Sequence, residues 1–265
     1  MKLQSLFGIL FSITALQCNS IKAQQSDLIG FNFGVSNFHI VDEHTSPMIF
    51  KGTGIAPSIQ YIHKGSDIEH IVDGSFYYDN LATSASNFIT ENFRGRFRYS
   101  LFYTTLHNEI VSNKPEFSVG GSITSFYCKS DYYFDMPSVQ ARSITSWYWS
   151  HSLDFSSMLN FNLSDKDLIS FRIFIPLVSN VSRPEYSPSG GYDYEKNEWI
   201  IETFGKTEFF PQNFSVNAHL DYRHMLLPHL CLQFGYEFYF AEYNKPNRIS
   251  MYMNNFRLGM FLILN

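Results

Sequence analysis

The chain has 265 residues, of which 45% are hydrophobic, 18% aromatic and only 16% charged. Soluble domains carry charges on about a quarter of their residues, and disordered chains are poor in aromatic residues, so this composition disfavours both classes. Acidic residues outnumber basic ones by 24 to 19. This balance argues against nucleic acid as a partner, because phosphate binding needs a surplus of basic side chains on one face.

The first 23 residues have the pattern of a secretory signal peptide. Lys2 supplies the positive start, residues 6–16 form an apolar core too short to span a bilayer, and Ala23 is a small residue at a suitable cleavage point. We therefore expect residues 1–23 to be removed and residues 24–265 to form one exported domain. Its two cysteines, Cys128 and Cys231, fall near opposite ends of their predicted strands, so we expect free thiols.

After this leader, apolar and polar residues alternate with a period of two, which is typical of strands with two unlike faces. Residues 230–240 place Leu, Leu, Phe, Tyr, Phe and Phe on one face and Cys, Gln, Gly, Glu and Tyr on the other. About ten segments behave in this way, and many are close to the ~9–11 residues of a tilted membrane strand. They are residues 27–39, 54–63, 67–80, 92–107, 115–128, 149–162, 167–179, 212–226, 229–243 and 248–264.

The links between these segments alternate in length. Links near residues 64–66, 164–166 and 227–228 are short, and the link near 113–115 is somewhat longer. Most of the links in the other set are long: 40–53, 81–91, 129–148 and 180–211. Short periplasmic turns and long external loops are typical of outer-membrane barrels. The predicted fold is therefore all-β: a transmembrane antiparallel up-and-down β-barrel of about ten strands. Pro57 and Pro176 are expected at the external rim, where water can replace the missing N–H bond.

Alternation alone does not say which face is inside. A soluble ligand-binding β-barrel of the periplasm would bury its apolar face. The apolar faces of this chain are long and rich in aromatic residues, and its polar faces mix Gly, Ser and Asn with charged residues. These features favour a membrane barrel with its apolar face towards lipid.

On these patterns the chain resembles the small outer-membrane β-barrel proteins of Gram-negative bacteria, and its Lys22-Ala23-Gln24 junction is similar to those of Bacteroidota. The resemblance implies a location in the cell outer membrane and outer-membrane lipid as a partner. No motif selects a subfamily. The last strand ends on Leu264-Asn265, whereas the commonest barrel pattern ends on an aromatic residue.

The inward faces of the predicted strands carry a near-balanced set of charges. Charges at membrane depth must be paired or hydrated, so we expect a charge network in the lumen with Arg–carboxylate pairs. Its expected members are Arg94, Arg96, Arg98, Arg172, Arg223, Arg257, Glu69, Asp73, Asp154, Asp221, Glu237 and His219.

Two functions are compatible with this network. In the first, the pairs fill and stabilise a narrow barrel that has a structural or interaction role. In the second, a restricted porin-like path passes small solutes, and the stripe of Arg94, Arg96 and Arg98 favours anions. Open porins have about 16–18 strands, so a barrel of about ten strands favours the first.

A third function is a hydrolase or acyltransferase acting at the barrel rim. The candidates are His151 with Ser152 and Asp154, and His219 with Asp221. Adjacent strand residues point to opposite faces, which separates His151 from Ser152. Omptin proteases also have about ten strands, but that is an analogy of fold alone. We assign no catalytic residue, and the sequence has no metal-ligand spacing and no cofactor motif.

Aromatic residues are concentrated in two of the expected loops, 129–148 and 180–211. They are suited either to contacts with a protein or glycan partner or to an aromatic girdle at the membrane surface. Within the second loop, residues 199–204 and 207–210 are rich in strand formers. We therefore expect a β-hairpin there, turning at Gly205-Lys206.

Overall fold

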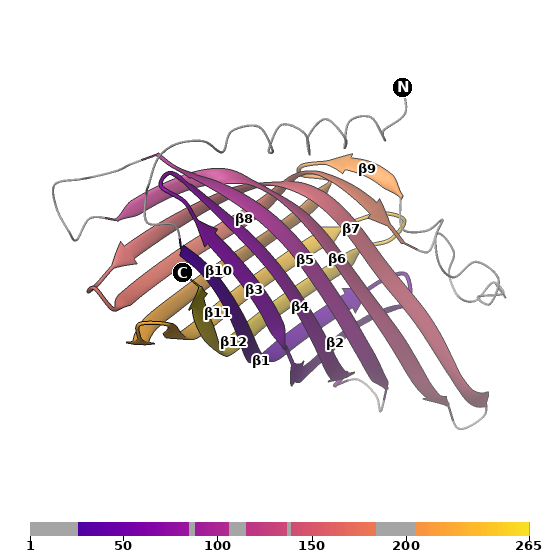
Figure 1. Cartoon of the computed structure of the whole chain (residues 1–265). Coiled ribbons are helices and arrows are strands. Elements are labelled where there is room, and N and C mark those ends of the chain that lie inside the picture. The colour runs from indigo at the N-terminus through magenta and orange to yellow at the C-terminus, as the bar shows by residue number, and fades with distance from the viewer. Residues whose placement is uncertain (1–25, 85–87, 106–114, 137–138, 184–204, 265) are drawn as a thin grey trace.

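The computed structural model describes residues 26–84, 88–105, 115–136, 139–183 and 205–264. The predicted signal peptide lies outside these ranges. Within them, no helix is long and apolar enough to cross a membrane. Antiparallel strands wind around one barrel (Figure 1).

Twelve strand segments form the wall of the barrel. They are β1 (Ser26–Asp42), β2 (Ser46–Ile55), β3 (Ser58–Lys64), β4 (Ile68–Ala82), β5 (Ile89–Thr104), β6 (Glu116–Met136), β7 (Val139–Asn162), β8 (Asp167–Ser182), β9 (Lys206–Phe209), β10 (Asn213–Leu227), β11 (Leu230–Tyr243) and β12 (Ile249–Leu264). Both β2 and β3 pair with β1 and β4, and both β9 and β10 pair with β8. Each of these couples is one interrupted barrel strand, so the wall has ten strands, as predicted.

The barrel closes between its first and last strands. Strands β1 and β12 pair antiparallel, from Asp27 opposite Leu264 to Asp42 opposite Ile249. The other barrel strands pair with their neighbours in sequence, which gives the predicted up-and-down topology. Closure removes the free edges of an open sheet, so backbone donors and acceptors are satisfied between strands, as a lipid environment requires.

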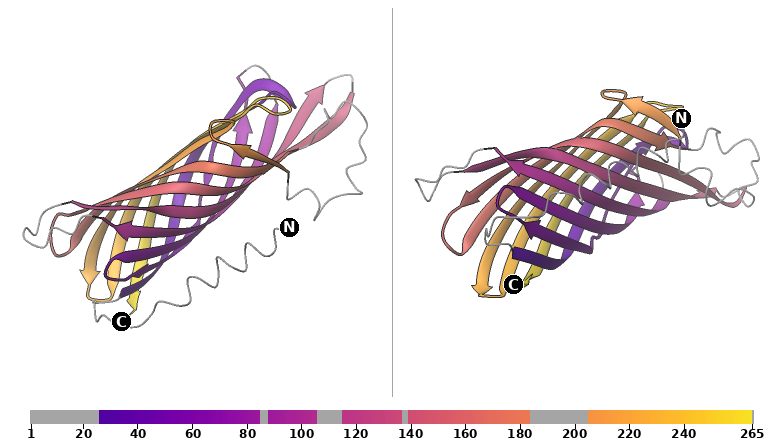
Figure 2. Two further views of the ribbon diagram at one scale, coloured as in Figure 1. Left: turned by 90° about the horizontal axis from the view of Figure 1, so that it is seen from above. Right: turned by 45° about the horizontal axis from the view of Figure 1, so that its top comes forward.

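The two ends of the barrel differ. At one end, the links β3–β4, β7–β8 and β10–β11 are short turns, and β1 begins and β12 ends there. At the other end, strands run on as hairpins, and the β6–β7 hairpin projects beyond its neighbours (Figure 2). Outer-membrane barrels have short turns in the periplasm and longer excursions outside. We therefore refer to these as the periplasmic end and the external end.

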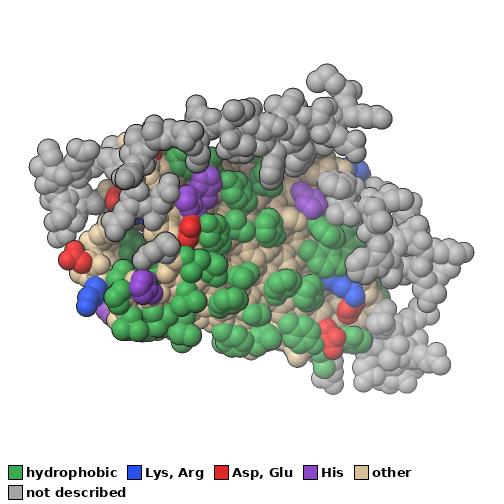
Figure 3. All heavy atoms as spheres, in the orientation of Figure 1, with side chains coloured by type: hydrophobic (Ala, Val, Ile, Leu, Met, Phe, Trp, Pro, Cys, Tyr) green, Lys and Arg blue, Asp and Glu red, His purple; other side chains and the backbone are tan. Residues whose placement is uncertain are grey.

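Apolar side chains cover the outside of the wall and polar ones line the inside. On β1, Phe31 and Phe33 are 64% and 59% exposed, whereas Asn32 and Ser36 between and beside them are buried in the lumen. Figure 3 shows apolar side chains over the middle of one face of the barrel, with charged and His side chains nearer its ends. A water-soluble protein rarely exposes so large an apolar surface. The alternative of a soluble barrel is therefore wrong, and the apolar face points to lipid.

Pro57 interrupts a barrel strand, contrary to the prediction that it begins one at the rim. The strand predicted at residues 54–63 in fact starts at Ser46, and Ala56 and Pro57 separate β2 from β3. Proline has no N–H, so the hydrogen-bond ladder breaks at this point. The neighbouring bonds survive, because Ala56 N donates to Gly34 O at 2.9 Å and Phe76 N donates to Pro57 O at 3.0 Å.

Two of the expected external loops are mostly strand. In the segment 81–91 only the ends are strand, because β4 ends at Ala82 and β5 begins at Ile89. The segments 40–53 and 129–148 are hairpins with links of three residues and two residues. In the last of them, Tyr132 and Tyr148 are each 1% exposed and point into the lumen. The aromatic residues of 129–148 therefore belong to strands that continue above the membrane. The sequence did not distinguish this from a loop, because aromatic residues are common in both.

The fourth expected loop, 180–211, is described only in part. Its segment β9 pairs with β8, with Val178 opposite Phe209. The expected hairpin partner, residues 199–204, lies outside the described residues. The strand predicted at 207–210 is therefore present, and its observed partner is the barrel wall.

Candidate functional site

The structure brings the twelve predicted network residues together inside the barrel. All of them are buried, each at 9% exposure or less. The arginines lie on β5, β8, β10 and β12, and the carboxylates lie on β4, β7, β10 and β11. Alternation put these side chains on the inner face, and closure of the wall makes side chains from distant strands neighbours.

Glu237 is the centre of the network. Its carboxylate accepts hydrogen bonds from Arg96, from Tyr77 Oη at 3.0 Å, from Asn217 Nδ2 at 3.0 Å and from Asn255 Nδ2 at 3.3 Å. A buried carboxylate is stable as an anion only when paired and hydrogen-bonded. This set of donors therefore fixes both the charge and the orientation of Glu237.

Asp221 forms a second centre towards the periplasmic end. It accepts hydrogen bonds from Arg172 and, at 3.0 Å, from Gln233 Nε2. Arg257 links the two centres, since its guanidinium lies 3.4 Å from Asp221 Oδ1 and 3.8 Å from Glu237 Oε2. Because Arg257 lies between the two carboxylates, it joins both centres into one network of charged side chains.

Arg94 is bound on the external side of the network. It pairs with Asp79, which also accepts a hydrogen bond from Ser36. Its guanidinium carbon lies 3.5 Å from the centroid of the Phe38 ring, a cation–π arrangement. Asp79 was missed in the sequence, although it has the same strand parity as the predicted Glu69 and Asp73. With Asp79 included, six arginines face six carboxylates.

Arg98 has a different environment, because it has no carboxylate within ion-pair distance among the residues described here. It donates to Asn217 Oδ1 at 2.8 Å and to Thr124 Oγ1 at 3.0 Å, and it lies over the Phe174 ring at 3.7 Å. Thr124 in turn donates to Asp154 at 2.5 Å. Arg98 and Asp154 are therefore joined through a hydroxyl group.

His219 is held as a neutral ring by its neighbours. Arg257 Nη2 lies 2.9 Å from His219 Nδ1, and a guanidinium can only donate, so Nδ1 accepts. The other nitrogen, Nε2, lies 2.7 Å from Asn217 Oδ1 and donates to it. Both nitrogens of this imidazole are thus committed to structural bonds.

These contacts do not build a nucleophile with its base at either predicted catalytic position. Asp154 lies in the lumen, bonded to Ser122 and Thr124, whereas His151 packs against the Trp149 ring on the outside, at 5.5 Å. Asp221 is occupied by its arginines. No cluster of three metal-ligating side chains exists within the described ranges.

Two layers of buried apolar side chains lie in the lumen, one on either side of the ion network. This corrects the expectation of a polar lumen throughout. The external apolar layer consists of Phe38, Ile40, Phe50, Ala56, Tyr77, Leu81, Phe126, Cys128, Tyr132, Tyr148, Val181, Tyr239, Ala241, Tyr243, Ile249, Met251 and Met253. The periplasmic apolar layer consists of Ile62, Ile71, Phe102, Met158, Phe174, Cys231 and Phe261. Both cysteines are free and buried in these layers, at Cys128 and Cys231, as predicted.

A buried ion pair at the external end lies outside the predicted set. Arg183 donates to Asp42 at 2.7 Å, and Ser146 also donates to this carboxylate. Arg183 further donates to Asn247 O at 2.7 Å, which ties β8 to the β11–β12 link. Asp42 and Arg183 escaped prediction because both lie in segments that were interpreted as loops.

Two matching groups lie on the outer surface at the periplasmic end. Asp27 accepts from Tyr61 Oη at 2.8 Å and lies 2.6 Å from His63 Nδ1. Asp167 has the same two partner types, a Tyr hydroxyl at 2.6 Å and a His Nδ1 at 2.7 Å. The equivalent partners of Asp167 are Tyr222 and His224. In both groups the Asp faces the His across a strand pair, and the Tyr is two residues before the His.

No protein-family model matches this chain, and no curated protein matches it. Among solved structures, the outer membrane protease OmpT from Escherichia coli is similar over 94% of this chain and 99% of its own, with a TM-score of 0.50 and 8% identity. Neisserial surface protein A is similar over 88% and 96%, with a TM-score of 0.38 and 10% identity. The translocator domain of the autotransporter NalP from Neisseria meningitidis is similar over 98% and 95%, with a TM-score of 0.38 and 11% identity.

At these identities the likeness to OmpT is one of fold. The class of the protein follows from its own wall and lumen. A closed ten-stranded barrel with an apolar exterior and buried interior charges is an outer-membrane β-barrel.

Proposed function

We propose that this protein is a sealed outer-membrane barrel with a structural or interaction role. The observation that carries the proposal is the filled lumen: the ion network occupies its middle, and an apolar layer closes it on each side. Well-packed interiors leave few spaces larger than a water molecule. A sealed lumen stabilises the wall and blocks solute flow.

Passage of anions along the arginine stripe has little support in this geometry. Arg94 is bound to Asp79, and Arg96 is bound to Glu237 with Asp73 at 3.6 Å. Arg98 donates to two neutral oxygens and lies over a ring. A selectivity filter must present its charges to a wet path. Here each guanidinium group is engaged by side chains of neighbouring or facing strands.

The interaction role belongs to the external hairpins. Strands β6 and β7 continue to Met136 and from Val139, beyond the ends of their neighbours. A rigid wall with projecting hairpins is suited to presenting a surface to a protein or glycan outside the cell. Export through a signal peptide at residues 1–23 is part of the same proposal.

Planar-bilayer recording of the purified protein without residues 1–23 tests the seal. We expect no reproducible current steps from protein that is shown to be folded by heat-modifiable migration in SDS gels. Regular steps would overturn the proposal. The anion path would be established in its place if Arg96→Glu shifted the selectivity of those steps towards cations.

A further inference from the structure

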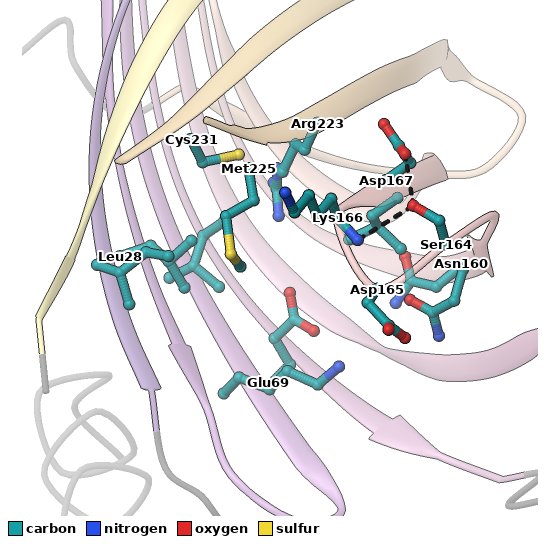
Figure 4. Close-up of a pocket in the computed structure, with 15 residues that line it drawn as sticks. Leu28, Glu69, Asn160, Ser164, Asp165, Lys166, Asp167, Arg223, Met225 and Cys231 are labelled. Carbon is teal, nitrogen blue, oxygen red and sulfur yellow. Dashed lines mark hydrogen bonds between the residues drawn. The ribbon is translucent and has the colours of Figure 1, made fainter. Parts of the chain in front are cut away.

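The periplasmic mouth of the barrel contains a cavity of about 170 Å³, at the periplasmic end of the ion network (Figure 4). Its apolar part is formed by Leu28, Ile62, Met225 and Ile263. An apolar cavity of about 150 Å³ holds one benzene-sized molecule, so this cavity has room for a single small ligand. The closed lumen above it leaves the periplasm as the side of entry.

Three buried polar side chains from different walls converge on this cavity: Arg223 from β10, Glu69 from β4 and Asn160 from β7. Their exposures are 9%, 9% and 5%. Around the barrel, β4 and β10 are five strands apart in either direction, so Arg223 and Glu69 lie on opposite walls. Figure 4 shows the side chains of Arg223 and Glu69 on opposite sides of the cavity.

Arg223 is held in place but keeps donors for a ligand. Its Nε donates to Gln233 Oε1 at 2.9 Å, and its guanidinium carbon lies 5.2 Å from the Phe261 ring centroid. Gln233 is itself fixed by Asp221 at 3.0 Å. In the described part of the chain, neither Nη atom of Arg223 has a hydrogen-bond partner. These two donors form the fork that matches a carboxylate.

The facing groups are also without protein partners. The Glu69 carboxylate makes no hydrogen bond and no ion pair with the residues that the structure describes. Asn160 Oδ1 is buried and has no hydrogen-bond partner. A buried acceptor that is left unpaired destabilises the fold, so such atoms usually have a partner. Of these groups, only Asn160 Oδ1 is a buried atom without a partner, whereas Arg223 and Glu69 offer a donor and an acceptor that no described residue uses. Together they can pair with polar groups that come from outside the chain.

We propose that this mouth cavity binds a small zwitterion of the α-amino-acid class with an aliphatic side chain. The ligand carboxylate pairs with Arg223, its ammonium group pairs with Glu69 and Asn160 Oδ1, and its side chain lies against the apolar part of the cavity. A ligand with one charge would leave the opposite wall unpaired. This inference goes beyond the sealed-barrel proposal, and only the side of entry rests on that proposal.

Calorimetric titration of the folded, detergent-solubilised protein with L-leucine tests the site. We expect saturable binding at concentrations on the order of 1 mM. Isoamylamine, which lacks the carboxylate, and 4-methylpentanoate, which lacks the ammonium group, should each bind at least about tenfold more weakly, because each loses a charge-assisted hydrogen bond. Absence of saturable L-leucine binding, or equal binding of the three compounds, would overturn the proposal.

Two variants test whether Arg223 and Glu69, on opposite walls of the cavity, bind the ligand. Arg223→Gln and Glu69→Gln keep side-chain size and polarity, and each should weaken L-leucine binding at least about tenfold. Arg248→Gln is the matched control, because Arg248 lies at the external end in an exposed pair with Glu242. Unchanged binding in both folded mouth variants would place the ligand elsewhere. The analogue comparison uses the unaltered chain, so it remains decisive if a variant fails to fold.

Discussion

Replacing Glu237 by Gln tests whether the ion network stabilises the barrel. The substitution keeps the shape of the side chain and removes one negative charge from the lumen. Arg96 would keep Asp73 at 3.6 Å, and Arg257 would keep Asp221 at 3.4 Å. The lumen would then hold an excess positive charge, and the new amide N–H groups would face donors that now bind a carboxylate.

The expected cost follows from the burial of the group. Glu237 is 0% exposed, and removing one partner of a buried ion pair costs about 3–5 kcal/mol. Glu242 on the same strand is the matched control, since its pair with Arg248 is 3.3 Å long and partly exposed. Exposed pairs contribute about 0–1 kcal/mol, so Glu242→Gln should be nearly neutral.

Urea unfolding of the refolded protein in detergent, followed by tryptophan fluorescence, measures both variants. With a slope of about 1–3 kcal/mol per M, Glu237→Gln should lower the midpoint by more than about 1 M. A midpoint for Glu237→Gln equal to that of the Glu242 control would refute the reasoning.

Two further predictions concern the rim and the thiols. Hydrogen bonds from Ser164, Tyr222 and His224 hold the pKa of Asp167, beside the β7–β8 turn, below its ordinary value. The contribution of Asp167 to stability should be complete above about pH 4 and should fall as the pH drops below that value. The difference in free energy of unfolding between the unaltered protein and Asp167→Asn should therefore shrink in acid. A difference that does not change with pH would contradict this. Cys231 lines the mouth cavity, whereas Cys128 lies in the external apolar layer, so maleimide should label Cys231 faster than Cys128 in the folded protein. Mass spectrometry of the two single Cys→Ser variants measures the labelling rates, and equal rates would count against the sealed lumen.

The inner and outer faces of the strands could be predicted from the sequence. Period-two alternation placed Arg172, His219 and Glu237 inside and Phe31 and Leu258 outside, as observed. This works because a strand has only two faces, and a slip of one residue would exchange them. The ten-strand count and the barrel closure follow from the same pattern.

The partners of the charges could not be predicted. Arg96 and Glu237 are 141 residues apart, and their contact depends on closure and on the stagger between strands, which alternation does not encode. The apolar layers were missed for a related reason. Phe38 and Tyr77 have the inward parity of their polar neighbours, but alternation does not tell which inward side chains are apolar enough to pack into a layer.

The two Asp–His–Tyr groups at the periplasmic end have a mechanical consequence. One lies on β1 and β3 and the other on β8 and β10, which places them on well-separated sides of the wall. Polar and aromatic side chains at the edge of an apolar band anchor a protein at the headgroup level. Two anchors on separate sides of the wall oppose tilting of the line that joins them, so they restrict the tilt of the barrel as well as its depth in the bilayer.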